Sequence, residues 1–252
     1  MTTRRHALLM LPAATLAPQA FAFDLGKALG AAKGAAQAAQ ISDDDIRAHG
    51  RRMAEQMDAK APLAPDSSPY ARRLAALTEK CRDDGGLALN YKVYLTREVN
   101  AFALPDGSIR FYSGLMDMMS DDEVRYVIGH EIGHVQAGHS KKRLQLAMGG
   151  GAAQQAVSAT GGRAGALADS DLGELFVKVV RAQHSQANEH EADDLAMRFM
   201  SRRGFDRRAA ASALDKLTAL SGGGGGGGTA AWLSTHPAPK ERAERMRQQA
   251  AA

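Results

Sequence analysis

The segment His130-Glu131-Ile132-Gly133-His134 contains the residue types that bind a transition-metal ion and use it in hydrolysis. On an α-helix, residues four apart lie on one face, so His130 and His134 can offer imidazole nitrogens to a single ion. Glu131 lies about 100° around the helix from His130, close enough to reach a water molecule there. Two hydrogen-bonded histidines beside a solvated glutamate would give the same string. The surrounding residues must decide between these interpretations.

The residues around this motif are typical of a capped and buried helix. Ser120 and Glu123 form the capping-box pattern at its expected start. Apolar residues then recur at helical spacing as far as Val135, and residues 141–143 place positive charge near the other end. The motif is therefore expected in mid-helix, which favours a metal site.

A metal site needs a further protein ligand. The chain has one cysteine, Cys81, so a thiolate cluster is excluded and the ligands must be histidines and carboxylates. Residues 188–193 form an acidic helical segment downstream, in which Glu189 and Asp193 share a face. One of them can bind the metal while the other accepts the outer N–H of a ligating histidine. Taken alone, the pair would better suit an exposed acidic helix face, and only its combination with the histidine motif favours the metal site.

The elements that must position these residues are mostly helical. The patterns predict helices over residues 41–57 and 70–82, strands over 89–95, 99–103 and 108–112, and helix or loop after Ser120. We therefore expect an α+β, mostly helical fold with a small β-sheet beside the motif helix. His139, His184 and His190 are expected to be ordinary polar helix residues, and Trp232 a core anchor.

The N-terminal residues are typical of a secretory signal peptide. Arg4 and Arg5 precede an apolar run, and Ala20-Phe21-Ala22 has the form of a cleavage site. The paired arginines leave the general and the twin-arginine export routes open. The run is short for a membrane span and no second candidate follows, so the mature chain is expected to be exported and to have no membrane span.

The expected organisation has three parts. A signal peptide is expected at residues 1–22, an N-terminal helical extension at residues 23–69, and the domain with the metal site at residues 70–252, with flexible segments at 144–165 and 221–229. The count of 32 basic against 28 acidic residues gives no dense basic patch, so nucleic acid is not an expected partner. The composition does not predict the oligomeric state.

Together the motifs resemble the zinc metallopeptidases that include the HtpX heat-shock protease, the mitochondrial Oma-type proteases and the type 1 CAAX prenyl protease. The resemblance extends from Asn100 to about Arg245. It rests on His130-Glu131-x-x-His134, on Glu189-x-x-x-Asp193, and on the landmarks Asn100-Ala101-Phe102-Ala103, Gly114-Leu115, Ser234-Thr235-His236-Pro237 and Arg242. It implies a zincin-like domain with one Zn²⁺, held by His130, His134 and Glu189 with Asp193 in support. The membrane spans of HtpX are absent, so the chain is similar to the soluble periplasmic members.

The resemblance also implies a zinc-dependent endopeptidase in which Glu131 acts as the base. His236 and Arg242 are candidates for stabilising the oxyanion; alternatively His236 occupies the open zinc position and holds the enzyme latent. Without the resemblance, His236 would be a turn residue before Pro237 and Arg242 a solvated residue on the terminal helix. Residues 108–112 are expected to form an edge strand that pairs with an extended or unfolded polypeptide.

The expected substrates are unfolded or misassembled envelope proteins, which makes protein quality control the expected role. The first alternative is a catalytically quiet zinc-binding chaperone or assembly factor that uses the same groove. An intact Glu131 argues against it, because a pure binder needs no base. A zinc hydrolase of non-peptide substrates is a second alternative, which the predicted edge strand makes less attractive.

Overall fold

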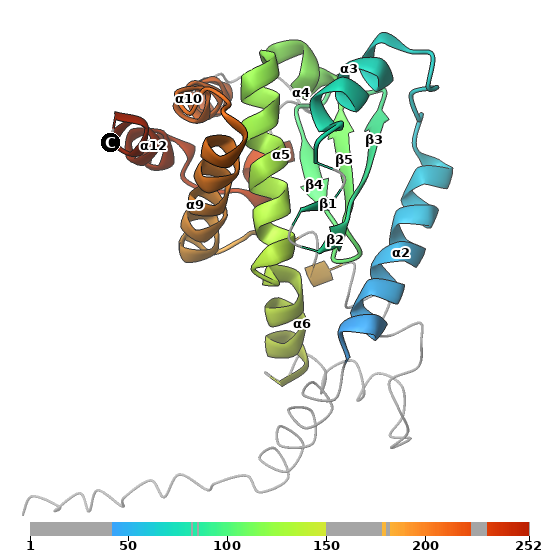
Figure 1. Cartoon of the computed structure of the whole chain (residues 1–252). Coiled ribbons are helices and arrows are strands. Elements are labelled where there is room, and N and C mark those ends of the chain that lie inside the picture. Colours follow the sequence, from blue (N-terminus) through green and yellow to red (C-terminus); the bar gives the residue numbers. More distant parts are fainter. Residues whose placement is uncertain are drawn as a thin grey trace, which may run out of the picture.

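The computed structural model describes residues 42–81, 83–84, 86–149, 178–179, 182–222 and 231–251. The predicted signal peptide, residues 23–41 and most of the two predicted flexible segments lie outside this part of the chain. The elements, shown in Figure 1, are α2 (Asp43–Lys60), α3 (Pro69–Thr78), β1 (Asp83–Asp84), β2 (Leu87–Ala88), β3 (Asn90–Tyr94), β4 (Ala101–Ala103), β5 (Ser108–Tyr112), α4 (Ser113–Met118), α5 (Asp121–Gln136), α6 (His139–Gly149), α9 (Gln186–Arg203), α10 (Ala209–Gly222), α11 (Ala231–Thr235) and α12 (Pro239–Ala251). This architecture confirms the predicted mostly helical α+β class with a small sheet.

The sheet has the strand order β3-β5-β4. β5 pairs in parallel with β3, from Asn90↔Ser108 to Tyr94↔Tyr112, and antiparallel with β4, from Ala101↔Phe111 to Ala103↔Ile109. β5 is therefore the central strand, and the prediction that residues 108–112 form an edge strand is wrong. Four of its five residues are buried, as expected of a strand that is covered on both faces. The edge nearest the motif helix is β4, which packs against α5.

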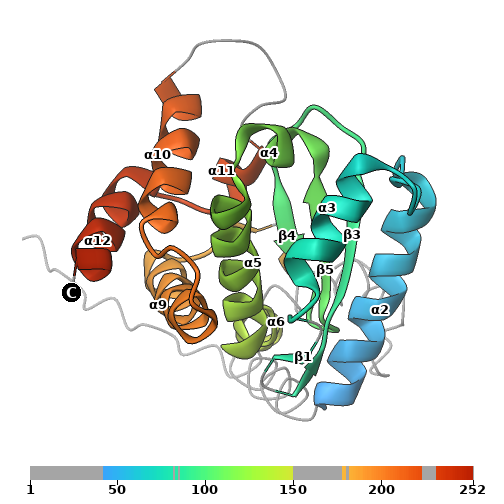
Figure 2. The same ribbon diagram turned by 45° about the horizontal axis from the view of Figure 1, so that its top comes forward.

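The motif helix α5 lies between the sheet and α9, as Figures 1 and 2 both show. Its predicted capping box is present, because Ser120 Oγ accepts from the Glu123 amide and the Glu123 carboxylate accepts from the Ser120 amide. The two helices approach closely at two glycines of α5. A Cβ added at Gly129 would lie 2.7 Å from Phe199 Cδ1, and one at Gly133 would lie 2.9 Å from the Ala192 carbonyl oxygen. This close approach brings the motif face of α5 to the acidic face of α9.

α2 covers the side of the sheet away from α9 (Figure 2). Its Asp58 accepts hydrogen bonds from Arg110 Nε, Tyr94 Oη and Lys92 Nζ, each at 2.8 Å. Arg110 is buried in the central strand, so this ion pair satisfies a charge that the sheet would otherwise enclose without a partner. α2 is thereby tied to the sheet by charge as well as by apolar packing.

The start of the predicted flexible segment 144–165 is helical. Residues 144–149 complete α6, and Leu144 is buried against Ile46 of α2 and Leu104. The glycines and glutamines of the segment suggested flexibility, but at its start an apolar side chain with a partner surface stabilises the helix instead. Among the described residues, no helix is both long enough and apolar enough to cross a bilayer.

Candidate metal centre

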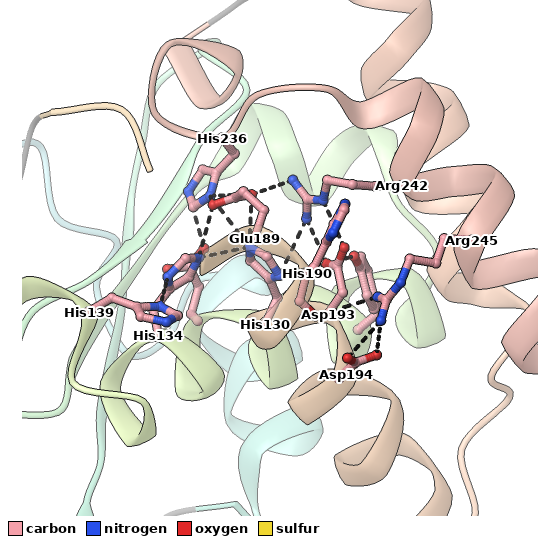
Figure 3. Close-up of polar contacts among 12 residues, drawn as sticks. His130, His134, His139, Glu189, His190, Asp193, Asp194, His236, Arg242 and Arg245 are labelled. Atoms are coloured by element: carbon pink, nitrogen blue, oxygen red, sulfur yellow. Dashed lines mark hydrogen bonds and ion pairs between the residues drawn. The ribbon is translucent and has the colours of Figure 1, made fainter. Parts of the chain in front are cut away.

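The crossing of α5 and α9 brings together His130, His134 and Glu189 (Figure 3). The two histidine Nε2 atoms lie 3.0 Å apart, and the Glu189 carboxylate oxygens lie 3.6 Å from His130 Nε2 and 3.3 Å from His134 Nε2. All three side chains are buried. Two imidazole nitrogens and a carboxylate that converge away from solvent form the donor set that Zn²⁺ prefers. The residues present therefore fit a zinc ion.

The outer nitrogen of His130 faces a buried network of charges. Its Nδ1 lies 3.0 Å from Asp193 Oδ1, and this oxygen also accepts a 2.7 Å hydrogen bond from Tyr126 Oη. Burial disfavours the ionised form of Asp193, but Arg242 beside it outweighs burial and holds the pKa of this carboxyl well below its usual range. An ionised Asp193 can accept a hydrogen bond from the His130 Nδ1–H group. This keeps the proton on Nδ1 and leaves the Nε2 lone pair free to bind metal.

Arg242 lies behind the ligands, and its side chain is buried. Its Nε and Nη2 donate to the two oxygens of Asp193 at 2.8 and 2.7 Å, and its Nη1 donates to Glu189 Oε2 (Figure 3). The interpretation of Arg242 as a solvated residue on the terminal helix is wrong, because two buried carboxylates need a buried cation. Its guanidinium therefore contacts both Asp193 and the predicted ligand Glu189.

His236 enters the same cluster from the C-terminal segment. Its Nδ1 lies 3.1 Å from Glu189 Oε1 and 3.4 Å from His130 Nε2, and the ligand atoms of all four residues lie within 4.8 Å of one another. Trp232 stacks on its ring with centroids 4.4 Å apart. His236 lies in the bend that follows α11, as the turn interpretation expected, but it is buried and belongs to the site. Trp232 is buried in the core as predicted.

Glu131 is also buried, beside the edge strand β4. Burial raises its pKa above the usual range, while His236, His130 and a backbone hydrogen bond from Ala103 of β4 oppose this rise. Within the described part of the chain, Glu131 Oε1 has no hydrogen-bond partner. A buried carboxylate with an oxygen that has no hydrogen-bond partner is suited to accepting a proton from a water molecule held beside it.

His139 and His184 are not the ordinary polar helix residues that the sequence predicted. His139 is fully buried, its Nδ1 lies 2.8 Å from His134 Nδ1, and the ring centroid of His184 lies 3.9 Å from that of His134. A spacing of five residues does not keep His139 on the motif face of a continuous helix. The chain turns at Gly138, where φ is +63°, and this break returns His139 to His134. Gly138 was the one signal for this arrangement.

A cavity of about 650 Å³ opens beside His134. It lies between β4, the end of α5 and the first turns of α2 and α6, and its lining includes Ala103, Leu104, Ile46 and Lys141. The cavity therefore connects the metal centre with the edge strand.

A motif helix with two histidines and a carboxylate from a following helix, beside a small sheet, defines a zincin-like metallopeptidase. Residues 69–250 match the protein family described as "Peptidase family M48", and the chain belongs to this family. It is 39% identical over 244 residues to "Metalloprotease LoiP" of Escherichia coli (strain K12), covering 96% of this chain and 95% of the relative. It is also 36% identical over 225 residues to "Metalloprotease YcaL" of the same strain, covering 89% and 87%.

A more distant relative is the "Beta-barrel assembly-enhancing protease" of Yersinia pestis, 28% identical over 260 residues, which cover 92% of this chain and 47% of the relative. Family membership and the buried donor set identify the chain as a zinc metalloendopeptidase. They do not favour the two alternatives, a catalytically quiet zinc-binding chaperone and a hydrolase of non-peptide substrates.

Proposed function

We propose that this metalloendopeptidase cleaves unfolded or misassembled proteins of the bacterial envelope. The observation that supports this substrate class is the position of β4, whose outer edge lies beside Glu131 and the cavity. An edge strand offers unpaired backbone groups, which bind an extended chain largely without regard to its sequence. Folded proteins keep their backbone groups paired, so unfolded segments are the substrates that this edge selects.

In this proposal His130, His134 and Glu189 hold the zinc ion. When bound, zinc polarises the scissile carbonyl and makes a water molecule more acidic. Glu131 accepts the proton of the attacking water and passes it to the leaving amine, for which its open Oε1 is suited. Asp193 orients His130 through its Nδ1. In this proposal Arg242 is a positioning residue, because it donates hydrogen bonds to Glu189 and Asp193 and so holds both carboxylates in place.

We assign His236 to the open zinc position, where it holds the enzyme latent. The supporting observation is the position of its Nδ1 among the three ligand atoms. A neutral imidazole is a good zinc ligand. In a zinc-loaded enzyme, His236 would then have to leave this cluster before a substrate could bind there.

The proposed location is the periplasm of a Gram-negative bacterium, after removal of a signal peptide at residues 1–22. The N-terminal pattern supports export, and a relative is named for its part in β-barrel assembly. Intact-mass measurement of the protein from cells is expected to give a chain that begins at or near Phe23. A species that retains residues 1–22 and sediments with membranes would contradict this proposal.

The proposed substrate class is tested by offering one protein in two states. Native ribonuclease A and the same protein after reduction and alkylation are incubated with the mature enzyme at equal concentration. Cleavage is expected for the unfolded form alone, since only its backbone groups are free to pair with β4. Equal cleavage of both forms would contradict the selection of unfolded chains.

A further inference from the structure

We propose that His139 and Glu191 are positioning residues for His134, and that the relay His134–His139–Glu191 determines how tightly this side of the centre holds zinc. The inference rests on the proposed ligand role of His134. It is supported by two contacts in sequence: His134 Nδ1 lies 2.8 Å from His139 Nδ1, and His139 Nε2 lies 3.2 Å from Glu191 Oε2.

The chemistry of imidazole gives each proton in this relay one place. A ligating His134 needs the lone pair of Nε2 and therefore carries its proton on Nδ1. The Nδ1–H group of His134 donates a hydrogen bond to His139 Nδ1, which must act as the acceptor. The proton of His139 then lies on Nε2, and this N–H group donates a hydrogen bond to the Glu191 carboxylate. The relay thus selects the His134 tautomer whose Nε2 faces Glu189 and His130.

The surroundings hold this relay in one geometry. His139 is fully buried, and Gly138 at φ +63° sets the turn that brings its ring back to His134. The ring of His184 packs against the ring of His134, with centroids 3.9 Å apart. A hydrogen-bonded partner on the outer nitrogen orients a ligating histidine and raises its basicity. His139 therefore does for His134 what Asp193 does for His130.

The two partners differ in strength. Asp193 is a buried carboxylate in direct contact with His130, whereas the Glu191 carboxylate reaches His134 only through a neutral ring and its side chain is 50% exposed. Solvent screens the charge of Glu191. We therefore expect the acceptor nitrogen of His139 to matter more than the charge at the end of the relay.

The test measures zinc affinity of the full mature chain by competition with a chelator. His139→Phe keeps a ring of similar size and removes the acceptor, so zinc affinity is expected to fall by about 10–100-fold, as losing such a partner generally does. Glu191→Ala is expected to give a smaller fall. Glu191→Gln is expected to recover most of it, because the amide oxygen can still accept from His139. This recovery is a response that a merely structural role would not produce.

Matched controls are His190→Phe, on the same helix as Glu191, and Glu79→Ala, at the exposed C-cap that follows α3. Both are expected to bind zinc as the wild type does. The Co²⁺-substituted protein gives a second readout, since a reoriented His134 shifts the ligand-field absorption in His139→Phe and in Glu191→Ala. If His139→Phe does not fold, Glu191→Ala still decides, because its side chain lies half in solvent.

Wild-type zinc affinity and an unchanged Co²⁺ spectrum in both Glu191→Ala and folded His139→Phe would overturn the relay. Failure of the underlying ligand assignment looks different. In that case His134→Ala itself would keep wild-type zinc affinity, whereas failure of the relay alone leaves His134→Ala unable to hold zinc.

Discussion

His130 and His134 lie on two sides of the metal centre, and different partners orient their rings. On one side, the outer nitrogen of His130 meets Asp193, which Arg242 and Tyr126 enclose without solvent. On the other, the outer nitrogen of His134 meets a neutral histidine, and a cavity opens beside it. We call the side of His130 the closed side; it can hold its ligand rigidly because the charges of Asp193 and Arg242 oppose each other. We call the side of His134 the open side; it places no charge against the outer nitrogen and borders the cavity.

Breaking the closed side is expected to have the largest effect on stability. Arg242→Ala leaves the buried carboxylates Glu189 and Asp193 without their cation, and breaking a buried ion pair in this way costs about 3–5 kcal/mol. Urea unfolding of the zinc-free protein measures this loss. Arg242→Lys keeps the charge but not the two-pronged contact, so it is expected to recover part of the stability. An Arg242→Ala variant that unfolds at the wild-type urea concentration would show that the closed side contributes no stability.

The helix contact that both sides share can be strained by one methyl group. Gly133→Ala places a Cβ 2.9 Å from the Ala192 carbonyl oxygen and must push α5 and α9 apart. Overpacking of this kind costs about 1–3 kcal/mol. Because Glu189 belongs to α9, zinc affinity is expected to fall as well, which chelator competition measures. Unchanged zinc affinity would mean that the ligands tolerate a wider separation of the helices.

A charged cluster outside the centre separates stability from zinc binding. Burial opposes ionisation of Asp58, but hydrogen bonds from Arg110, Lys92 and Tyr94 lower its pKa. A lowered folded-state pKa means that the stabilisation is present at neutral pH and is lost as pH falls through the acid range. Asp58→Asn is expected to lower the free energy of unfolding by about 1–3 kcal/mol at pH 7. Urea unfolding measures this loss, and the difference from the wild type is expected to narrow as pH falls below the usual carboxyl pKa. Its zinc affinity at pH 7 is expected to equal that of the wild type.

The smallest expected effect concerns the residue that bridges both sides. His236→Ala removes the side chain that we place in the open zinc position, so basal proteolysis of unfolded substrate is expected to rise by a few fold. Rates on casein at equal zinc occupancy measure this change. A fall in kcat toward the 10²–10³-fold loss typical of oxyanion-hole donors would instead favour the oxyanion role. Equal rates would exclude both roles.

Part of the closed side was predictable from the sequence, because the spacing of residues within each helix is local. The capping box places the motif in mid-helix, and the four-residue spacing of Glu189 and Asp193 puts both on one face. The burial of Arg242 was not predictable in the same way. It depends on the packing of α12 on α9, which no local pattern encodes.

The open side depends on contacts that the sequence pattern does not reveal. His139 reaches His134 only because the helix breaks at Gly138, and its partner Glu191 lies 52 residues further along the chain. The place of β5 between β3 and β4 was hidden for a similar reason. Alternation predicts a strand, but which strands become its neighbours is set by the parallel crossover from β3.

The central claim is that Glu131 is the base of a zinc endopeptidase whose ligands are His130, His134 and Glu189. Wild type and Glu131→Gln are compared on casein, with the zinc content of the same samples measured in parallel. The account predicts equal zinc and a loss of proteolysis of at least about 10²–10⁴-fold, the usual contribution of a general base. Glu131→Gln with full zinc and wild-type proteolysis would contradict the account, and so would a loss of zinc together with activity.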